Sequence, residues 1–412
     1  MDLHPRVLVA PDSFKGSLGQ AEAAAAIAAG VRRAAPGATV IELPLSDGGE
    51  GWLETLVGAT ADGRVERATV TGPLGEPLEG RFGLIDGERT AVIEVATASG
   101  LQLVEPTPAT FRAASTAGTG ALIGSALDAG ARRILVGLGG SATTDGGAGL
   151  AVALGARLLD VDGEPIGASA PGNEALADIA AVDLTGLDPR LAATEVLAAT
   201  DVDNPLLGPT GAAAVYGPQK GAGPADVGPA DAALANFAAR VEAALDREPR
   251  GTPGPGDPTA PGPAPRDLPG AGAAGGLGFG LVAFCGARLA SGIELALDVV
   301  GFDAALAAAD LVITGEGRID LQTLHGKVVA GVAGRARTAG VPAYAIGGAV
   351  DPAVLADWPA FAAAGLAGVE STLEEPLPPA AALAPEAARV RLTAAAERLL
   401  RTVGAGPGLD RG

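Results

Sequence analysis

The sequence predicts an α/β protein, because short apolar runs alternate with segments of helical periodicity along most of its 412 residues. The runs are apolar throughout, which is typical of strands buried on both faces of a parallel sheet. They lead into turns rich in glycine, aspartate or serine. The predicted strands are residues 7–10, 40–43, 134–138, 196–199, 311–313 and 343–346.

Segments between these strands carry helical patterns. Ser17 followed by Gln20 predicts a capping box for a helix that runs to about Ala34. The remaining apolar stripes, which we interpret as core-facing sides of helices, are Leu150-Leu154-Leu158, residues 234–245 and residues 387–403.

Two stretches depart from this alternation. Residues 64–71, 80–85 and 90–95 alternate in polarity and are separated by Gly-Pro and Asp-Gly turns, which predicts an antiparallel meander in a second domain. Residues 249–269 contain eight prolines. We expect this Pro-rich segment to be an extended, largely disordered surface insertion.

Length and composition restrict the class of protein. At roughly 100–200 residues per domain, 412 residues favour two domains and allow three at most. Hydrophobic residues make up 48% of the chain, which excludes a disordered protein. Cys285 is the only cysteine, so an intrachain disulfide and a cysteine-based zinc site are both excluded.

The net charge of −20 argues against nucleic acid and anionic membranes as partners, because both would be repelled. No stretch reaches about 18 uninterrupted apolar residues, so no membrane span is expected. The first residues lack the basic region of a signal peptide. These observations predict a soluble cytoplasmic protein.

The glycine-rich segment 139–147 is the strongest candidate for a phosphate site, since ligands of open α/β sheets bind beyond the carboxyl ends of strands. Its four glycines would let the backbone approach a phosphate closely, and a helix that begins near Gly146 would point free N–H groups at the ligand. Ser141, Thr143 and Thr144 would add hydroxyl groups. A tight turn without a ligand is the alternative.

Lysine is rare, with three residues against 25 arginines, and each lysine adjoins a glycine. Lys15, Lys220 and Lys327 could therefore mark sites that need a compact ammonium group. Chance placement in a chain with 63 glycines is the alternative.

Seven carboxylates follow predicted strands, and they could hold Mg²⁺ or accept the proton of an attacking hydroxyl. Solvated side chains or helix caps are the alternative for each of them. Asp201 and Asp203 are two residues apart in an extended stretch, so both could face one ligand and divide these two roles. The seven are Asp12, Asp47, Asp145, Asp201, Asp203, Glu316 and Asp320.

Taken together, the loop motifs resemble those of the glycerate kinase family of the bacterial type-one class. They occur in the family's order and span about residues 7–348. The matching segments are residues 10–17, 46–51, 139–147, 200–206, 218–222, 272–276 and 314–323.

This resemblance implies an enzyme, an ATP-dependent kinase that phosphorylates D-glycerate with Mg²⁺ and gives 2-phosphoglycerate. The alternatives are 3-phosphoglycerate as product, a related small hydroxy acid as substrate, and a non-catalytic binding protein. ATP and D-glycerate would be the partners, and a homodimer stays open.

The resemblance also implies two α/β domains with the active site in the cleft between them. Residues 1–60 and 290–412 would form a Rossmann-like domain from both chain ends. Residues 61–289 would form a flavodoxin-like middle domain that contains the meander and the Pro-rich insertion.

The loop residues and the resemblance together give the expected site roles. Asp201, Lys15, Lys327 and Asp320 are the expected catalytic residues, and Asp47 and Asp203 are the expected metal ligands. The residues expected to bind substrate or phosphate are Asp12, Ser13, Gly139, Gly140, Ser141, Thr143, Thr144, Gly146, Gly147, Lys220, Gly315, Glu316 and Arg318.

Overall fold

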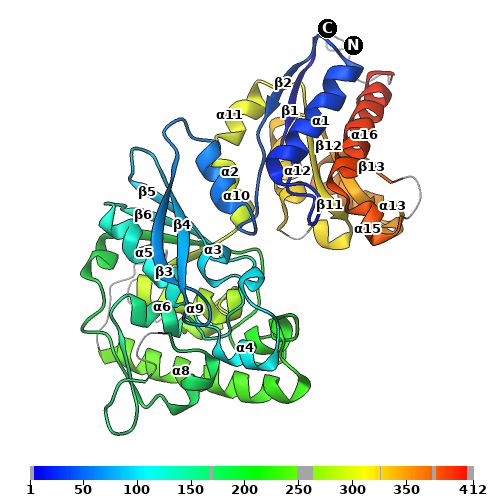
Figure 1. Ribbon diagram of the computed structural model, residues 1–412. Helices are drawn as coiled ribbons and strands as arrows, with labels where there is room; N and C mark the ends of the chain where they lie inside the picture. Colours follow the sequence, from blue (N-terminus) through cyan, green and yellow to red (C-terminus); the bar gives the residue numbers. More distant parts are fainter. Residues whose placement is uncertain (1–3, 167–169, 248–262, 325, 374–376, 406–412) are drawn as a thin grey trace. The chain divides into compact units, whose positions relative to one another are not determined.

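The computed structural model describes residues 4–166, 170–247, 263–324, 326–373 and 377–405 (Figure 1). The chain divides into two compact units. The first combines the two chain ends, residues 1–47 and 291–412, and the second is the continuous middle, residues 48–290. No helix in the described ranges is long and apolar enough to cross a membrane.

The first unit is built on a five-stranded sheet in which all strands run parallel. Its strands are β1 (Arg6–Val9), β2 (Thr39–Glu42), β11 (Leu311–Ile319), β12 (Ala343–Val350) and β13 (Leu366–Ser371). They lie in the order β2-β1-β11-β12-β13. Numbered along this unit the order is 2-1-3-4-5, the flavodoxin-like order of doubly wound sheets.

Two helices from opposite ends of the chain pack together on this sheet. Helices α1 (Gln20–Ala34) and α16 (Pro385–Ala405) lie side by side (Figure 1). A Cβ on Gly30 would lie 2.3 Å from the carbonyl oxygen of Thr393, so only glycine permits this close approach. The remaining helices of the unit are α10 (Gly292–Val299), α11 (Phe302–Ala307), α12 (Val328–Ala339), α13 (Pro352–Ala356), α14 (Trp358–Ala364) and α15 (Pro379–Ala382).

The second unit is built on a six-stranded mixed sheet. Its strands are β3 (Arg64–Thr71), β4 (Pro77–Ile85), β5 (Thr90–Glu94), β6 (Arg133–Gly137), β9 (Glu195–Ala199) and β10 (Arg288–Ala290). They lie in chain order, with β3, β4 and β5 antiparallel and β5, β6, β9 and β10 parallel. A separate antiparallel pair joins β7 (Arg157–Leu159) to β8 (Ala181–Asp183).

Helices cover this second sheet and enclose its core. The rings of Phe237 and Phe279 meet edge to face with centroids 6.2 Å apart, which joins α8 (Pro224–Arg247) to α9 (Ala273–Cys285). The other helices are α2 (Trp52–Gly58), α3 (Ala96–Ser99), α4 (Pro108–Ala113), α5 (Ala117–Asp128), α6 (Ala148–Ala153) and α7 (Ala212–Tyr216).

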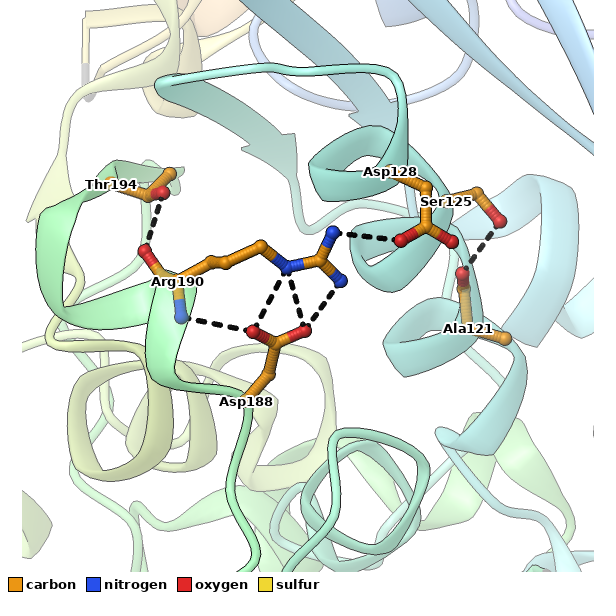
Figure 2. A network of polar contacts seen from close by, with 6 residues as sticks. All are labelled: Ala121, Ser125, Asp128, Asp188, Arg190 and Thr194. Carbon is orange, nitrogen blue, oxygen red and sulfur yellow. Dashed lines mark hydrogen bonds and ion pairs between the residues drawn. The ribbon is translucent and has the colours of Figure 1, made fainter.

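Arg190 anchors the connection between β8 and β9 (Figure 2). Its guanidinium group donates to both carboxylate oxygens of Asp188 and, at 2.7 Å, to Asp128 at the end of α5. Asp188 also accepts the backbone N–H of Arg190, which caps the short 3₁₀ helix Pro189–Ala193. Because Asp128 is exposed, its ion pair contributes no more than about 1 kcal/mol.

The α/β class and all six predicted strands are confirmed, and so is the meander. The strand orders differ in one respect from what the resemblance implied. The flavodoxin-like order, expected for the middle of the chain, occurs in the unit formed by the chain ends. The boundary between the units falls after Asp47 rather than residue 60, because α2 packs on β4 and β5 of the second unit.

Three local predictions were wrong. The helix start predicted at Ser17 lies at Gln20, because Glu22 accepts the N–H of Gly19 while the hydroxyl of Ser17 donates to the carbonyl of Phe14. The predicted loops after residues 313 and 346 belong to β11 and β12, which continue to pair with each other beyond the end of β1.

The third concerns the Leu150-Leu154-Leu158 stripe, which does not form one helix. Helix α6 ends at Ala153, and Gly155 with φ of +102° turns the chain so that Leu158 lies in β7.

The structure describes only the last part of the Pro-rich segment 249–269. Residues 249–262 lie outside the described residues. The last part packs on the core, since Leu268 contacts it and Arg266 pairs with Glu242 of α8. The segment 263–269 is therefore part of the second unit.

Candidate active site

The first cluster of polar side chains lies at the carboxyl ends of three neighbouring strands of the first unit. Asp12 follows β1, and its N–H donates to the carbonyl of Gly315 in β11 at 2.9 Å. On the other side of β1, the N–H of Leu45 donates to the carbonyl of Pro11 at 2.9 Å, which brings the Ser46-Asp47 turn alongside. Strands β1 and β11 flank the point where the strand order reverses, and ligands of such sheets bind there.

The carboxyl group of Asp12 has the most strongly shifted pKa in this cluster. Its side chain is buried, and burial together with the charge of Asp47 raises the pKa of Asp12 to about 7. The N–H of Ser13, at 2.6 Å, and the charge of the exposed Lys15 oppose this shift, while Glu316 adds to it. The structure thus brings together five of the predicted site residues.

Glu316 and Lys327 form an ion pair beside Asp12. Lys327 Nζ lies 3.4 Å from Oε2 of Glu316, and the hydroxyl of Thr323 donates to Oε1 at 2.6 Å. The same hydroxyl accepts the N–H of Asp320 at 3.1 Å, so Thr323 ties the turn after β11 to the buried carboxylate. Burial raises the pKa of Glu316, and the Thr323 hydroxyl opposes the shift ahead of Lys327.

Three predicted residues of the same motif have structural partners. The side chain of Arg318 is exposed and donates to Asp351 at 2.7 Å. Asp320 accepts the N–H of Gln322 at 2.9 Å and caps the turn. At Gly315 a Cβ would lie 2.4 Å from the carbonyl oxygen of Ile346, so close packing of β12 explains this glycine.

The residues of this cluster suit a hard cation such as Mg²⁺. Asp47 and Glu316 both raise the pKa of Asp12, so the three carboxylates lie close enough to repel one another. The buried hydroxyls of Ser46 and Thr314 have no hydrogen-bond partner among the residues that the structure describes. No three acidic, histidine or cysteine side chains among the described residues form a complete metal site. A Mg²⁺ ion would thus need phosphate oxygens or water beside one or two carboxylates.

The second cluster is the glycine-rich loop 139–147, which follows β6 in the second unit. The N–H of Gly139 donates to the carbonyl of Gly48 at 3.0 Å, and the N–H of Ala142 donates to Ser99 at 2.8 Å. A Cβ on Gly147 would lie 2.8 Å from the Cα of Gly280, and φ of Gly147 is +83°. Packing therefore requires this glycine whether or not a ligand binds.

Asp145 occupies the start of α6, which corrects the expectation that this helix points free N–H groups at a ligand. Its carboxylate is fully buried and accepts the N–H groups of Gly147 and Gly149 at 3.1 Å. It also accepts the N–H and the hydroxyl of Thr116 at 2.8 and 2.7 Å. Burial raises the pKa of Asp145 against these hydrogen bonds. The carboxylate thus takes the place that an external anion would need.

Lys220 supports the loop from inside the protein. Its buried Nζ donates to the hydroxyl of Ser141 at 3.0 Å and to the carbonyl of Thr143 at 2.6 Å. Burial lowers the pKa of Lys220 to about 7, and the charge of Asp145 opposes this shift. Because the Ser141 oxygen accepts from Lys220, its own O–H is directed elsewhere. Within the described part of the chain, the buried hydroxyl of Thr144 has no hydrogen-bond partner.

Asp201 and Asp203 lie in different environments beyond β9. Asp201 is partly buried, while Asp203 is exposed. Asn204 orders the following turn, since it donates to the carbonyl of Thr210 at 2.7 Å and accepts the hydroxyl of Tyr216 at 2.6 Å. Strands β6 and β9 are neighbours, so Asp201 follows the strand next to the one that carries the glycine-rich loop.

Sequence reasoning missed several polar residues of these clusters. Thr323 lay within a quoted motif but received no role, and Ser46 and Thr116 received none either. Glu94 could have been found, because it is the one charged residue of the otherwise apolar strand β5. A charge inside a buried strand is costly unless it is hydrogen-bonded, which is the signal that was available.

Buried carboxylates, lysines and a glycine-rich loop at strand ends are groups that a small-molecule kinase uses in phosphoryl transfer. The glycerate kinase family model matches residues 7–404, and the chain belongs to this family. It is 49% identical over 345 residues to the glycerate kinase of Bacillus subtilis, with 84% of this chain and 85% of that protein covered. It is 43% identical over 345 residues to the glycerate 2-kinase of Escherichia coli, with the same coverage.

A solved structure supports the same assignment. The crystal structure of a Salmonella typhimurium LT2 protein, provisionally named glycerate kinase 2, superposes on this chain with a TM-score of 0.80. The two sequences are 43% identical. The match covers 98% of this chain and 99% of that one.

Proposed function

We propose that this protein transfers the γ-phosphoryl group of ATP to D-glycerate and releases 2-phosphoglycerate. The family membership supports glycerate as substrate, and the Escherichia coli relative named glycerate 2-kinase supports this product. The observation that carries the proposal is the cluster of buried carboxylates with Lys327 at the β1–β11 switch point. Phosphoryl transfer needs this combination of cation-binding and charge-neutralising groups.

In this proposal the first cluster holds the metal-nucleotide. Asp47 and Asp12 are the proposed Mg²⁺ ligands, because their carboxylates lie together and oxygen donors suit this ion. When bound, Mg²⁺ would neutralise charge on the phosphate oxygens. Lys15 and Lys327 are proposed to neutralise the remaining charge of the transferred group. Lys327 is held in place by Glu316 for this task.

The glycine-rich loop and Asp201 would serve the acceptor side of the reaction. Ser141 and Thr144 have hydroxyl groups with hydrogen-bonding capacity left, so we assign them to anionic substrate oxygens. Asp201 is the proposed acceptor of the glycerate hydroxyl proton, since it follows β9 next to this loop. Asp203 is exposed, so this proposal places the metal at Asp47 and Asp12 instead.

A coupled assay of ADP release tests the proposal. The purified protein should consume ATP only when both Mg²⁺ and D-glycerate are present. Phosphorus NMR of the product separates 2-phosphoglycerate from 3-phosphoglycerate. Turnover with another small hydroxy acid but not with D-glycerate would identify that acid as the substrate instead. Absence of turnover with every small hydroxy acid tested would refute the kinase activity.

A further inference from the structure

Glu94 is a buried carboxylate that the proposed reaction does not use. It is the last residue of β5 and is 5% exposed. Its Oε2 accepts the N–H of Leu53 at 3.1 Å, and the N–H of Gly51 also stabilises its charged form. Both N–H groups belong to the start of α2, so Glu94 binds the backbone that enters this helix.

The chain that enters α2 lies directly on the carboxyl ends of β6 and β9. We call residues 48–51 the entry segment. Its Gly48 accepts the N–H of Gly139 at 3.0 Å, and a Cβ on Gly48 would lie 3.1 Å from the Cβ of Ala199. A Cβ on Gly139 would lie 2.4 Å from the Cα of Gly49. The backbones touch without intervening side chains, so the path of the entry segment and the path of the glycine-rich loop depend on each other.

We infer that Glu94 is a positioning residue whose carboxylate holds the entry segment against the ends of β6 and β9. The entry segment also accepts backbone hydrogen bonds, from the N–H of Trp52 to Gly49 at 3.2 Å and from the N–H of Thr55 to Gly51 at 3.0 Å. It consists of three glycines and the exposed Glu50, and both Gly48 and Gly51 have positive φ, at +97° and +83°. Glycine loses the most conformational freedom on ordering, so such a segment needs an external anchor.

The position of the entry segment matters for the reaction. It directly follows Asp47, the proposed metal ligand, and it supports Gly139 at the start of the phosphate loop. To this extent the inference rests on the proposed function. The anchoring of the backbone by Glu94 is independent of it and can be measured without substrate.

Ionisation of Glu94 is the variable that an experiment can control. Burial raises the pKa of Glu94 to about 7, the N–H groups of Leu53 and Gly51 oppose the shift, and the charges of Glu54 and Glu50 add to it. Arg81 pairs with Glu54 at 2.9 Å and balances part of that charge. Because the pKa of the anchored carboxyl lies above the ordinary value of 4.5, the anchored state holds the proton more tightly than an opened state in which Glu94 meets water. The anchor should therefore weaken as pH rises from about 4.5 to about 7.

Hydrogen–deuterium exchange of the entry segment and the first turn of α2 tests the anchor directly. In the wild-type protein, protection of residues 49–53 should fall between pH 5 and pH 8 after correction for intrinsic exchange. In Glu94→Gln that fall should vanish, because the amide does not ionise and its oxygen still accepts an N–H group. Glu54→Gln, which removes an exposed carboxylate of α2, is the matched control and should keep the fall.

Kinetics provide the second readout. In the wild type, KM for Mg²⁺-ATP should rise as pH increases through about 7, while kcat changes less. This step should be absent in Glu94→Gln and partly regained in Glu94→Asp. Protection that is independent of pH in the wild type overturns the inference even if Glu94→Gln fails to fold. Loss of the pH-dependent fall in Glu94→Gln in a protein without glycerate kinase activity would uphold the anchor and refute the proposed function instead.

Discussion

At the scale of single residues, the two clusters hold charged groups where water reaches them poorly. Asp12 and Lys220 are both buried, and burial moves the pKa of each to about 7 from opposite directions. Groups that titrate near neutrality can exchange protons and charge at working pH, and perturbed pKa values gather at functional sites. Both residues were expected from the sequence, but only their burial separates them from ordinary surface charges.

Replacing a lysine of the first cluster should reduce catalysis without unfolding the protein. Lys15→Ala and Lys327→Ala should each lower kcat/KM by about 10²-fold or more, because a preorganised charge is lost from the phosphoryl-transfer site. Lys15→Arg and Lys327→Arg should also have low activity, because a planar guanidinium group does not replace a compact ammonium charge. Steady-state kinetics measure the effect, with the exposed Arg389→Ala as control. Normal kinetics in both arginine variants would contradict the role of the ammonium groups.

Asp201 and Asp203 can be separated by conservative substitutions. Asp201→Asn should lower kcat by roughly 10²–10⁴-fold, the scale of general acid–base assistance, while the fold and the nucleotide affinity are kept. Asp203→Asn should have a much smaller effect, because its side chain is exposed. The measurement is kcat at saturating Mg²⁺ with a melting curve for each variant. A folded Asp201→Asn enzyme with near-normal kcat would move the base to another carboxylate.

At the scale of elements, Asp145 joins the starts of two helices. It accepts donors from Thr116 before α5 and from Gly147 and Gly149 at α6. In Asp145→Asn the side-chain NH₂ group would face N–H donors, which cannot accept a hydrogen bond from it. An unsatisfied buried N–H costs about 1–3 kcal/mol. We therefore expect Tm to fall by roughly 3–10 °C.

The control for Asp145 is a half-buried aspartate with the same capping geometry. Asp160 accepts the N–H groups of Asp162 and Glu164 at 2.9 Å in an exposed turn, and Asp160→Asn should change Tm little. Differential scanning calorimetry compares the two variants. Equal melting temperatures for Asp145→Asn and wild type would show that these buried hydrogen bonds contribute nothing to stability.

The Pro-rich segment should be dispensable only in part. Replacing residues 249–262 by a short Gly/Ser linker should leave activity within about threefold, because such a composition cannot bury enough apolar surface to join a core. Extending the deletion to residue 269 should lower Tm, since Arg266 pairs with Glu242 and Leu268 packs on the core. Activity and melting curves of both deletions measure this. Loss of activity with the shorter deletion alone would contradict the prediction.

At the scale of the whole molecule, buried acids make stability depend on pH. Asp12 has a pKa of about 7 in the folded chain against an ordinary value of 3.8. The folded chain therefore binds more protons than the unfolded chain between these values, and the free energy of unfolding falls as pH rises from about 4 to about 7. Asp12→Asn removes this pH-dependent contribution to the free energy of unfolding. Its Tm should exceed that of the wild type by a few degrees at pH 8 but not at pH 4.5.

Activity gives the complementary readout for Asp12→Asn, which should be inactive if Asp12 holds Mg²⁺. The exposed Asp162→Asn is the control and should leave both the Tm and its pH dependence unchanged. An Asp12→Asn protein that is less stable than wild type at pH 8 would contradict the assigned cost of burying this carboxylate. A gain in stability at the expense of activity is the usual exchange at a functional site.

Local sequence determined the strands, the meander and the presence of a phosphate-type loop, because apolar runs and glycine-rich turns are read from neighbouring residues alone. Motifs spread over most of the chain also indicated the family. The start of the first helix was predicted wrongly at Ser17, because the Glu22 side chain binds the N–H of Gly19 and the helix begins at Gln20.

Tertiary structure decided what depends on residues far apart in the chain. The pairing of β1 with β11 brings Asp12 beside Glu316, 304 positions later, and no local pattern encodes that pairing. The same holds for Lys220 beneath Ser141 and for Asp145, which fills the helix start that the sequence assigned to a ligand. Burial and hydrogen bonding set the charge state of these groups, and both arise only when distant segments pack together.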